Sequence, residues 1–150
     1  MTFLKLSPDM INMFSNILLF VYLLICSYTD LKTKTVNLNI SIIFATIAVA
    51  FSIFLNNYSL PYILTCLIPG AFLAVISLIF SNSLGMGDAI VLLICGIFLG
   101  AYKALELLLF GLVISSLFSI CILIKKHTLK YTFPFVPFLF AAYILNIFLK

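Results

Sequence analysis

Long apolar stretches alternate with short polar breaks along the whole chain. Six apolar stretches can be marked, and most approach the roughly 20 residues that a helix needs to cross a bilayer. We therefore predict an all-α, polytopic membrane protein built as a bundle of about six transmembrane helices. The stretches cover residues 11–28, 38–55, 60–80, 89–102, 105–124 and 133–149. Between them we expect polar breaks over 29–37, 56–59 and 81–87, a tight turn at Lys103, and a break over 125–130.

Composition supports this interpretation. Of the 150 residues, 65% are hydrophobic and only 8% are charged, whereas soluble domains average about 25% charged residues. Crossing the bilayer uses almost the entire chain, so we expect residues 1–150 to form a single transmembrane domain. Its function must then lie in the helix bundle or in the short loops.

Charge and cysteine content argue against several classes of function. The eight basic residues are all lysines, spread along the chain without a dense patch, so we expect no nucleic-acid partner. The cysteines lie in apolar stretches without Cys-x-x-Cys spacing, which speaks against a zinc site or a disulfide framework. We expect neither a metal nor a cofactor. The four cysteines are Cys26, Cys66, Cys95 and Cys121.

Two carboxylates, Asp30 and Asp88, stand at the mouths of predicted helices. A charged group at membrane depth is costly, so its default interpretation is functional. The second follows Gly85 and Gly87 and precedes a stretch of only 14 residues, 89–102, which would rise about 21 Å against a hydrocarbon core of about 30 Å. We expect this helix to begin below the membrane surface. Asp88 would then lie in a recess, where the glycines let the backbone turn sharply and approach a substrate closely.

The order of helices predicts that the two acids meet. If the first helix leaves the membrane at Asp30, two further crossings return the chain to the same face, where the fourth helix enters at Asp88. Two acids that share a site suggest acid-base chemistry on a water molecule. Lysines near helix ends favour a cytoplasmic location for this face. Lys32, Lys34, Lys125, Lys126 and Lys130 lie on it, against Lys5, Lys103 and Lys150 on the other.

Simpler roles are available for both acids. Asp88 could only cap the fourth helix, and Asp30 could be an interfacial residue paired with a nearby lysine. Asp9 precedes the first helix on the opposite face, where we expect it to be solvated.

Three segments together resemble the type IV prepilin peptidase family, in its small form without an extra N-terminal domain. They are residues 30–37, then Gly85-Met86-Gly87-Asp88 leading into an apolar helix, and residues 133–138, Phe-Pro-Phe-Val-Pro-Phe. The resemblance implies a membrane-embedded aspartyl endopeptidase with Asp30 and Asp88 as catalytic residues and Gly85 and Gly87 in the active-site loop. Such an enzyme removes the leader peptide of prepilin or prepilin-like proteins at the cytoplasmic membrane face. Its implied partners are that substrate and the lipid bilayer.

The chain departs from the family pattern in two places. The family usually has Ile-Pro-Asn about six residues beyond the first Asp, whereas Val36 and Asn37 stand here without the proline. A lysine common two residues after the second Asp is replaced by Ile90. These changes concern the loop and the range of substrates more than the pair of acids. The absent Cys-x-x-Cys element argues against the methyltransferase activity of bifunctional relatives.

Two further expectations concern the acids themselves. A small transporter or a non-catalytic pilus-assembly protein could use Asp30 and Asp88 to bind a proton or cation, since intramembrane carboxylates also serve that role. If the pair is catalytic, Asp88 stands at a helix N-terminus and Asp30 near a helix C-terminus. These ends predict that Asp88 holds the charge and acts as the base while Asp30 carries the shared proton, although Lys32 and Lys34 oppose this.

Overall fold

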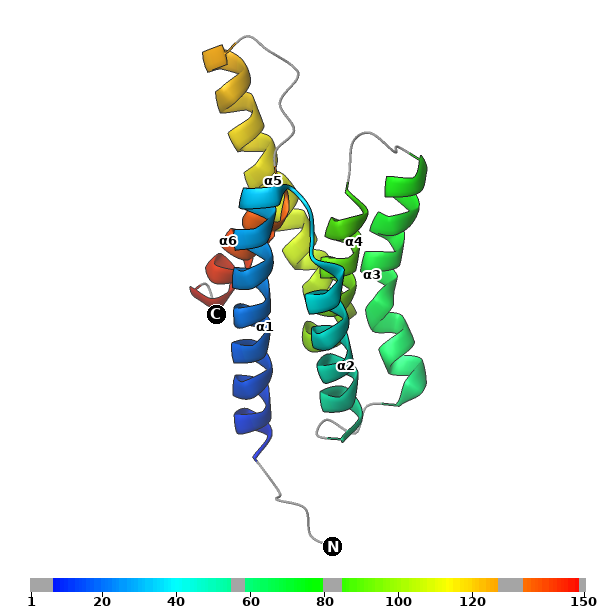
Figure 1. The fold of residues 1–150 in the computed structure, drawn as a ribbon. Coiled ribbons are helices and arrows are strands. Elements are labelled where there is room, and N and C mark those ends of the chain that lie inside the picture. The colour runs from blue at the N-terminus through cyan, green and yellow to red at the C-terminus, as the bar shows by residue number, and fades with distance from the viewer. Residues whose placement is uncertain (1–6, 55–58, 80–84, 127–133, 149–150) are drawn as a thin grey trace, which may run out of the picture.

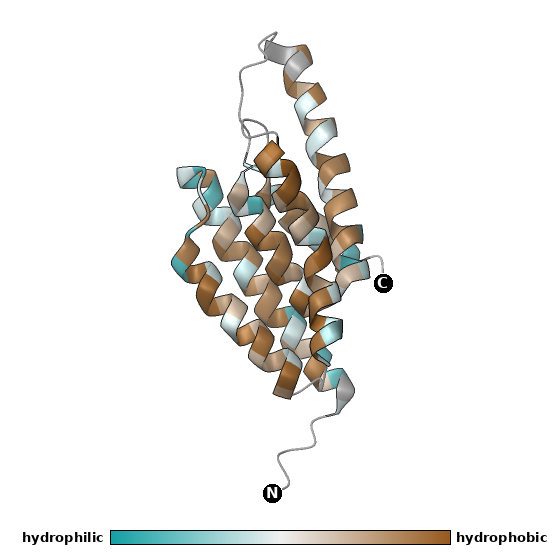
Figure 2. Cartoon of the chain, turned by 90° about the vertical axis from the view of Figure 1, so that its right-hand side faces the viewer, coloured by the Kyte–Doolittle hydropathy of each residue, from teal (hydrophilic) through white to brown (hydrophobic). Residues whose placement is uncertain are grey.

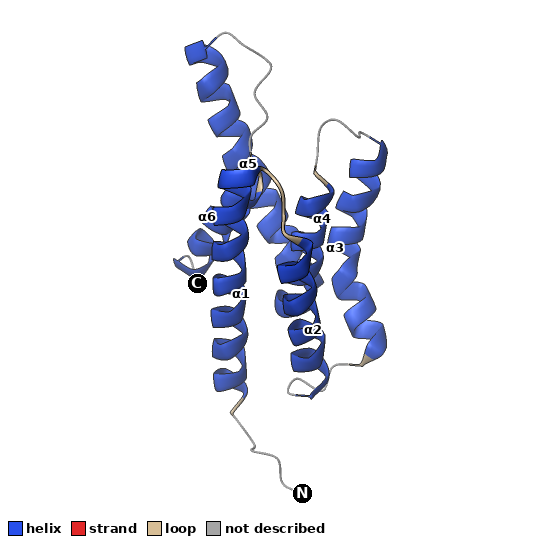
Figure 3. Cartoon of the chain, in the orientation of Figure 1, coloured by secondary structure: helices blue, strands red, loops and turns tan. Residues whose placement is uncertain are grey.

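The computed structural model describes residues 7–54, 59–79, 85–126 and 134–148, which contain six helices and no strand (Figures 1 and 3). The predicted all-α fold is therefore confirmed. The helices are α1 (Pro8–Thr33), α2 (Leu38–Phe54), α3 (Leu60–Ile79), α4 (Met86–Leu99), α5 (Ala101–Lys126) and α6 (Val136–Phe148).

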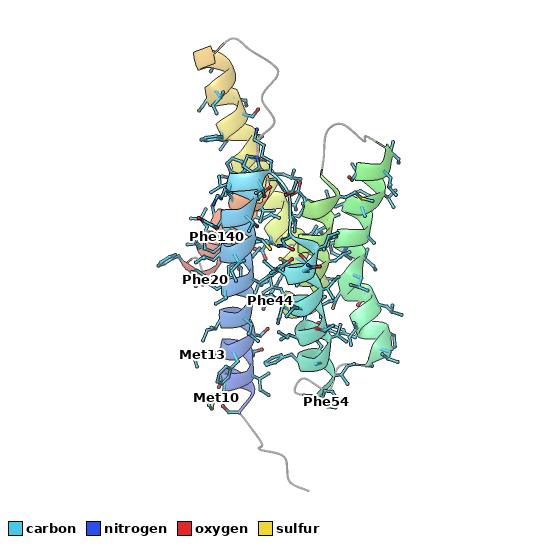
Figure 4. All side chains as sticks on the ribbon, in the orientation of Figure 1. Met10, Met13, Phe20, Phe44, Phe54 and Phe140 are labelled. Carbon is cyan, nitrogen blue, oxygen red and sulfur yellow. The ribbon has the colours of Figure 1, made fainter. Side chains whose placement is uncertain are left out.

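Three of these helices are long and apolar enough to cross a membrane, over Asp9–Thr33, Leu60–Ile79 and Ala101–Ile122. The other three, α2, α4 and α6, are shorter apolar helices. Figure 2 shows apolar residues along most of the bundle and hydrophilic ones chiefly near helix ends. Many large apolar side chains are exposed on the outside, among them Met10, Met13 and Phe54 (Figure 4). An apolar exterior of this kind is what a bilayer covers, so the fold is a helical membrane bundle.

The first helix is longer than the apolar pattern predicts. It continues to Thr33, so Asp30 lies within its last turn, and the expected break from Thr29 onwards is wrong. The reason is that threonine hydroxyls can bond to carbonyls of the preceding turn instead of to water. Thr29 Oγ1 donates to the Ile25 carbonyl at 3.1 Å, and Thr33 Oγ1 donates to the Thr29 carbonyl at 2.8 Å. The helix ends at Thr33, and the next residue, Lys34, caps it in the left-handed backbone conformation with φ 54°.

The boundary between α4 and α5 also differs from expectation. The predicted turn at Lys103 is wrong, because Lys103 lies in the first turns of α5. The chain breaks instead at Gly100, whose φ of 88° is a conformation that glycine adopts at no steric cost. Several expected boundaries lie wholly or partly outside the described residues. They are the breaks over 56–59, 81–87 and 125–130, and the helix limits at Leu55, Phe80, Phe133 and Leu149.

Helix α4 forms the centre of the bundle, in contact with α1, α2, α3 and α5. Its approach to α3 is especially close, because the space for a Cβ on Gly96 is taken by the Cys66 carbonyl oxygen. On α3, a Cβ on Gly70 would lie 2.6 Å from the Leu93 backbone nitrogen. Small residues allow such backbone contact between membrane helices. The 14-residue α4 is thus short, as predicted, and is held by close packing.

Candidate active site

The structure brings Asp30 and Asp88 together at one end of the bundle. Asp30 lies in the last turn of α1 and Asp88 in the first turn of α4. These two helix ends lie at the same end of the bundle (Figure 1). The two carboxyl groups are close enough to repel each other electrostatically. Both side chains are buried, with exposed fractions of 5% for Asp30 and 9% for Asp88. Buried carboxyls at short range are a setting in which one proton is shared.

Asp30 receives a hydrogen bond from a helix that sequence reasoning did not connect to it. The backbone N–H of Val136, the first residue of α6, donates to Asp30 Oδ2 at 3.1 Å. The start of a helix carries free N–H groups and the positive end of its dipole, so it favours a negative charge. The expectation for Asp30, which weighed the C-terminus of its own helix against Lys32 and Lys34, is therefore incomplete. Asp88 thus lies in the first turn of α4, and Asp30, in the last turn of α1, faces the first residue of α6.

Asp88 is the third residue of α4 and so does not occupy the N-cap position. That position belongs to Gly85, which offers no side chain to cap the helix. The carboxyl group of Asp88 turns back towards this residue, because a Cβ on Gly85 would lie 3.3 Å from Asp88 Oδ2. The Asp88 N–H bonds to the Gly85 carbonyl oxygen at 3.0 Å. Gly85 therefore leaves room beside the carboxylate.

Neither glycine before Asp88 has the positive φ that would mark a sharp glycine turn. Gly85 is extended, with φ −75° and ψ 134°, and Gly87 lies within α4. Among the described glycines, only Gly100 has a positive φ. Gly87 lets α4 and Val36 approach each other closely, since an added Cβ would come within 2.7 Å of Val36 Cγ2. Its neighbour is the chain's own loop between α1 and α2, drawn in tan in Figure 3.

That loop contains the first departure from the family pattern. Val36 is half-buried against the start of α4, and Asn37 immediately precedes α2. Asn37 Oδ1 accepts from the Asn39 N–H at 3.1 Å, and its carbonyl accepts from the Ser41 N–H at 3.1 Å. Asparagine is a favoured residue at the start of a helix for this reason. The loop is therefore anchored beside Gly87 even without a proline.

Further contacts tie α1 to the neighbouring helices. The hydroxyls of Tyr22 on α1 and Ser41 on α2 lie 3.2 Å apart, and the ring of Tyr22 contacts that of Phe44 with centroids 5.0 Å apart. On the other side, the rings of Phe20 and Phe140 join α1 to α6 with centroids 5.3 Å apart (Figure 4). Asp30 thus belongs to a helix that is held from both sides.

The other residues considered for the site lie away from the two acids or outside the described residues. Asp9 is exposed in the first turn of α1, at the opposite end from Asp30, and Ile90 packs against the apolar core. His127, the chain's one histidine, is outside the described residues, as is Phe133 of the third family segment. Within the described part of the chain, no three His, Cys, Asp or Glu side chains gather where they could hold a metal ion.

Comparison with protein families gives one match. The type IV leader peptidase family matches residues 17–124, which is well over half of the chain and includes both acids. The chain belongs to the type IV leader peptidase family. No curated protein and no solved structure matches it.

Membership of a leader peptidase family makes peptide-bond hydrolysis the reaction that the site has to explain. Hydrolysis needs a base to activate water and an acid to protonate the leaving group. In this leader peptidase, α1 and α4 place two buried carboxyl groups within electrostatic range of each other at one end of an apolar bundle. The start of α6, beyond the matched range, adds a hydrogen-bond donor to one of them. Pro134 and Pro137 mark a helix start in the sequence, but nothing local shows that this start meets Asp30.

Proposed function

We propose that the chain is a membrane aspartyl endopeptidase that removes the leader peptide of prepilin or prepilin-like proteins. Asp30 and Asp88 are the catalytic residues, and Gly85 and Gly87 form the backbone beside them. The observation that carries this proposal is the pair of buried, mutually repelling carboxyl groups in a member of the leader peptidase family. Like charges at such range cannot both ionise readily, so the pair titrates as a coupled unit.

The mechanism requires one proton on the pair. The ionised carboxylate takes a proton from water while the water oxygen attacks the scissile carbonyl carbon. The protonated partner gives its proton to the carbonyl oxygen, and collapse of the tetrahedral intermediate releases the amine after proton transfer to nitrogen. No residue other than the two acids has to change its charge.

The location of the pair suits a substrate with a membrane helix. In the family that the sequence resembles, the cut falls just before the hydrophobic helix of the substrate. Asp30 and Asp88 lie at one end of the apolar bundle, near the exposed Lys32 and Lys34. A substrate helix in the bilayer beside the bundle would present its leader junction at this depth. The excess of lysines on this face supports a cytoplasmic site.

Cysteine labelling tests this orientation. In a background with the four native cysteines replaced and activity retained, Thr35→Cys and Ser59→Cys put single thiols at exposed positions next to opposite ends of α2. We expect a membrane-impermeant thiol reagent to reach Thr35→Cys only from the cytoplasmic side and Ser59→Cys only from the other side. Labelling of Thr35→Cys from outside would overturn the cytoplasmic site.

A second candidate function, proton or cation transport, rests on the same two acids. One preparation can distinguish transport from leader cleavage. Proteoliposomes holding the purified chain and a prepilin are assayed for leader release and for cation-dependent flux. Leader release without flux is the expected result. Flux without release, retained after Asp30→Glu and Asp88→Glu, would instead support the transporter.

A further inference from the structure

The first turn of α6 has a single backbone donor available for Asp30. Val136 is the first helical residue, and Pro137 after it has no N–H. The N–H groups of Phe138 and Leu139 are used by the Phe135 carbonyl, at 3.0 and 3.3 Å. The Val136 N–H, directed to Asp30 Oδ2 at 3.1 Å, is therefore the contact through which the positive end of α6 reaches the pair.

Positive charge gathers on the Asp30 side of the pair. Lys32 and Lys34 follow Asp30 at exposed positions, whereas α2, α3 and α4 contain no basic residue. The C-terminus of α1 opposes a charge on Asp30, but a hydrogen bond to an ionised carboxylate is stronger than the interaction with a helix end. Asp88 lies at the start of α4 and also accepts a backbone hydrogen bond, at Gly85, but it has no lysine on its own helix, so Lys32 and Lys34 make the difference between the two acids.

The other titratable groups around Asp30 do not reverse this asymmetry. On α1, the buried Cys26 lies one turn before it, and on α4 its neighbour is Asp88. Helix α6 has one titratable side chain, Tyr143, whose hydroxyl bonds to the Asn16 carbonyl near the other end of α1.

We infer that the backbone N–H of Val136 is a positioning group that keeps Asp30 as the ionised member of the pair, so that Asp88 carries the shared proton. On the proposed function, Asp30 is then the base that takes a proton from water, and Asp88 is the acid that protonates the substrate. This reverses the assignment that the ends of α1 and α4 alone predict.

Proline substitution tests the N–H directly. Val136→Pro removes the donor at the first helical position, where proline fits the backbone best. Val136→Ala keeps the donor and removes the buried side chain, so it is the matched control. Circular dichroism and thermal unfolding check that both variants fold.

Each variant is combined with Asp88→Asn, which leaves Asp30 alone in the site, and with Asp30→Asn, which leaves Asp88 alone. The carboxyl band in infrared spectra of the purified protein gives the titration midpoint of the remaining acid. No substrate is involved, so the result is independent of whether the chain cleaves prepilins.

We expect Val136→Pro to move the Asp30 midpoint to higher pH by about one unit, since a hydrogen bond to the charged form is lost. Val136→Ala should leave it in place, and neither change should move the Asp88 midpoint. With Val136 intact, Asp30 should titrate at lower pH than Asp88. An unmoved Asp30 midpoint in Val136→Pro, or an equal shift in Val136→Ala, would overturn the role of the N–H. If Val136→Pro does not fold, the titration midpoint of Asp30 in Asp88→Asn is compared with that of Asp88 in Asp30→Asn. A lower midpoint for Asp88 would overturn the assignment.

Discussion

Asp88 belongs to a helix fixed by close backbone packing, whereas the carboxyl group of Asp30 accepts a hydrogen bond from a segment distant in the sequence. Helix α4 has no room for a Cβ at Gly96, against the Cys66 carbonyl of α3. Helix α6 donates to Asp30 through the Val136 N–H, and near the other end of α1 the Tyr143 hydroxyl lies 3.0 Å from the Asn16 carbonyl. Two residues of one site therefore depend on different interactions, Asp88 on backbone packing between helices and Asp30 on a hydrogen bond.

Loss of either carboxyl group should reduce activity most, whichever interactions hold it. Asp30→Asn and Asp88→Asn should each reduce leader cleavage by at least about 100-fold, because each variant loses proton transfer while keeping nearly the same volume. Cleavage rates of purified variants measure this. Asp9→Asn, at the exposed start of α1, is the matched control and should cleave normally. Normal cleavage by either site variant would remove that residue from the catalytic pair.

On the Asp88 side, packing should dominate stability. Gly96→Ala should destabilise the fold by about 1 to 3 kcal/mol, since a Cβ there meets a backbone carbonyl that cannot rotate away. Thermal unfolding in detergent measures the loss. Gly111→Ala is the control, because its Cβ would meet the flexible end of the Leu139 side chain at 2.9 Å and should cost less. Equal losses in the two variants would contradict a special role for the α3–α4 contact.

The loop beside Asp88 should affect activity more than stability. Gly87→Ala places a Cβ 2.7 Å from Val36 Cγ2, so it should push the α1–α2 loop away and reduce cleavage by about 10-fold, equivalent to about 1.4 kcal/mol in the barrier. Adding Val36→Ala makes room and should restore most of the rate. If the double variant is no faster than Gly87→Ala alone, the contact with Val36 is not the cause.

Polar contacts on the Asp30 side should give the smallest effect of these. Tyr143→Phe removes the hydroxyl that donates to the Asn16 carbonyl and should cost about 1 kcal/mol of unfolding free energy. Tyr102→Phe is the control, because Tyr102 is exposed and should tolerate the change. Unfolding curves of the two variants that superimpose would show that this bond adds nothing to the attachment of α6.

The apolar pattern predicts the helices well because each stretch is long and its composition leaves little alternative. Their ends are less predictable. Thr29 and Thr33 look like the start of a loop but bond within α1, and Gly100, not Lys103, supplies the backbone conformation that separates α4 from α5. Local patterns do not distinguish a threonine that bonds to its own helix from one that faces water.

The meeting of the two acids follows from counting membrane crossings, which needs only the number of helices. The contacts that surround each acid do not follow from that count. The bond between Val136 and Asp30 joins residues 106 positions apart, and the place of Val36 over Gly87 depends on how the α1–α2 loop crosses α4. Neither contact has a signal in the spacing of residues. Both determine the surroundings of the catalytic pair that we propose.

The mass of a prepilin expressed together with this chain shows whether Asp30 and Asp88 cleave leader peptides. With the wild-type chain, we expect a prepilin shortened by its leader, with a new N-terminus just before the hydrophobic helix. With the Asp30→Asn, Asp88→Asn double variant, present in the membrane at the same level, we expect the full-length mass. A full-length prepilin with the wild-type chain, or a shortened one with the double variant, would contradict the claim that these two carboxylates cleave leader peptides.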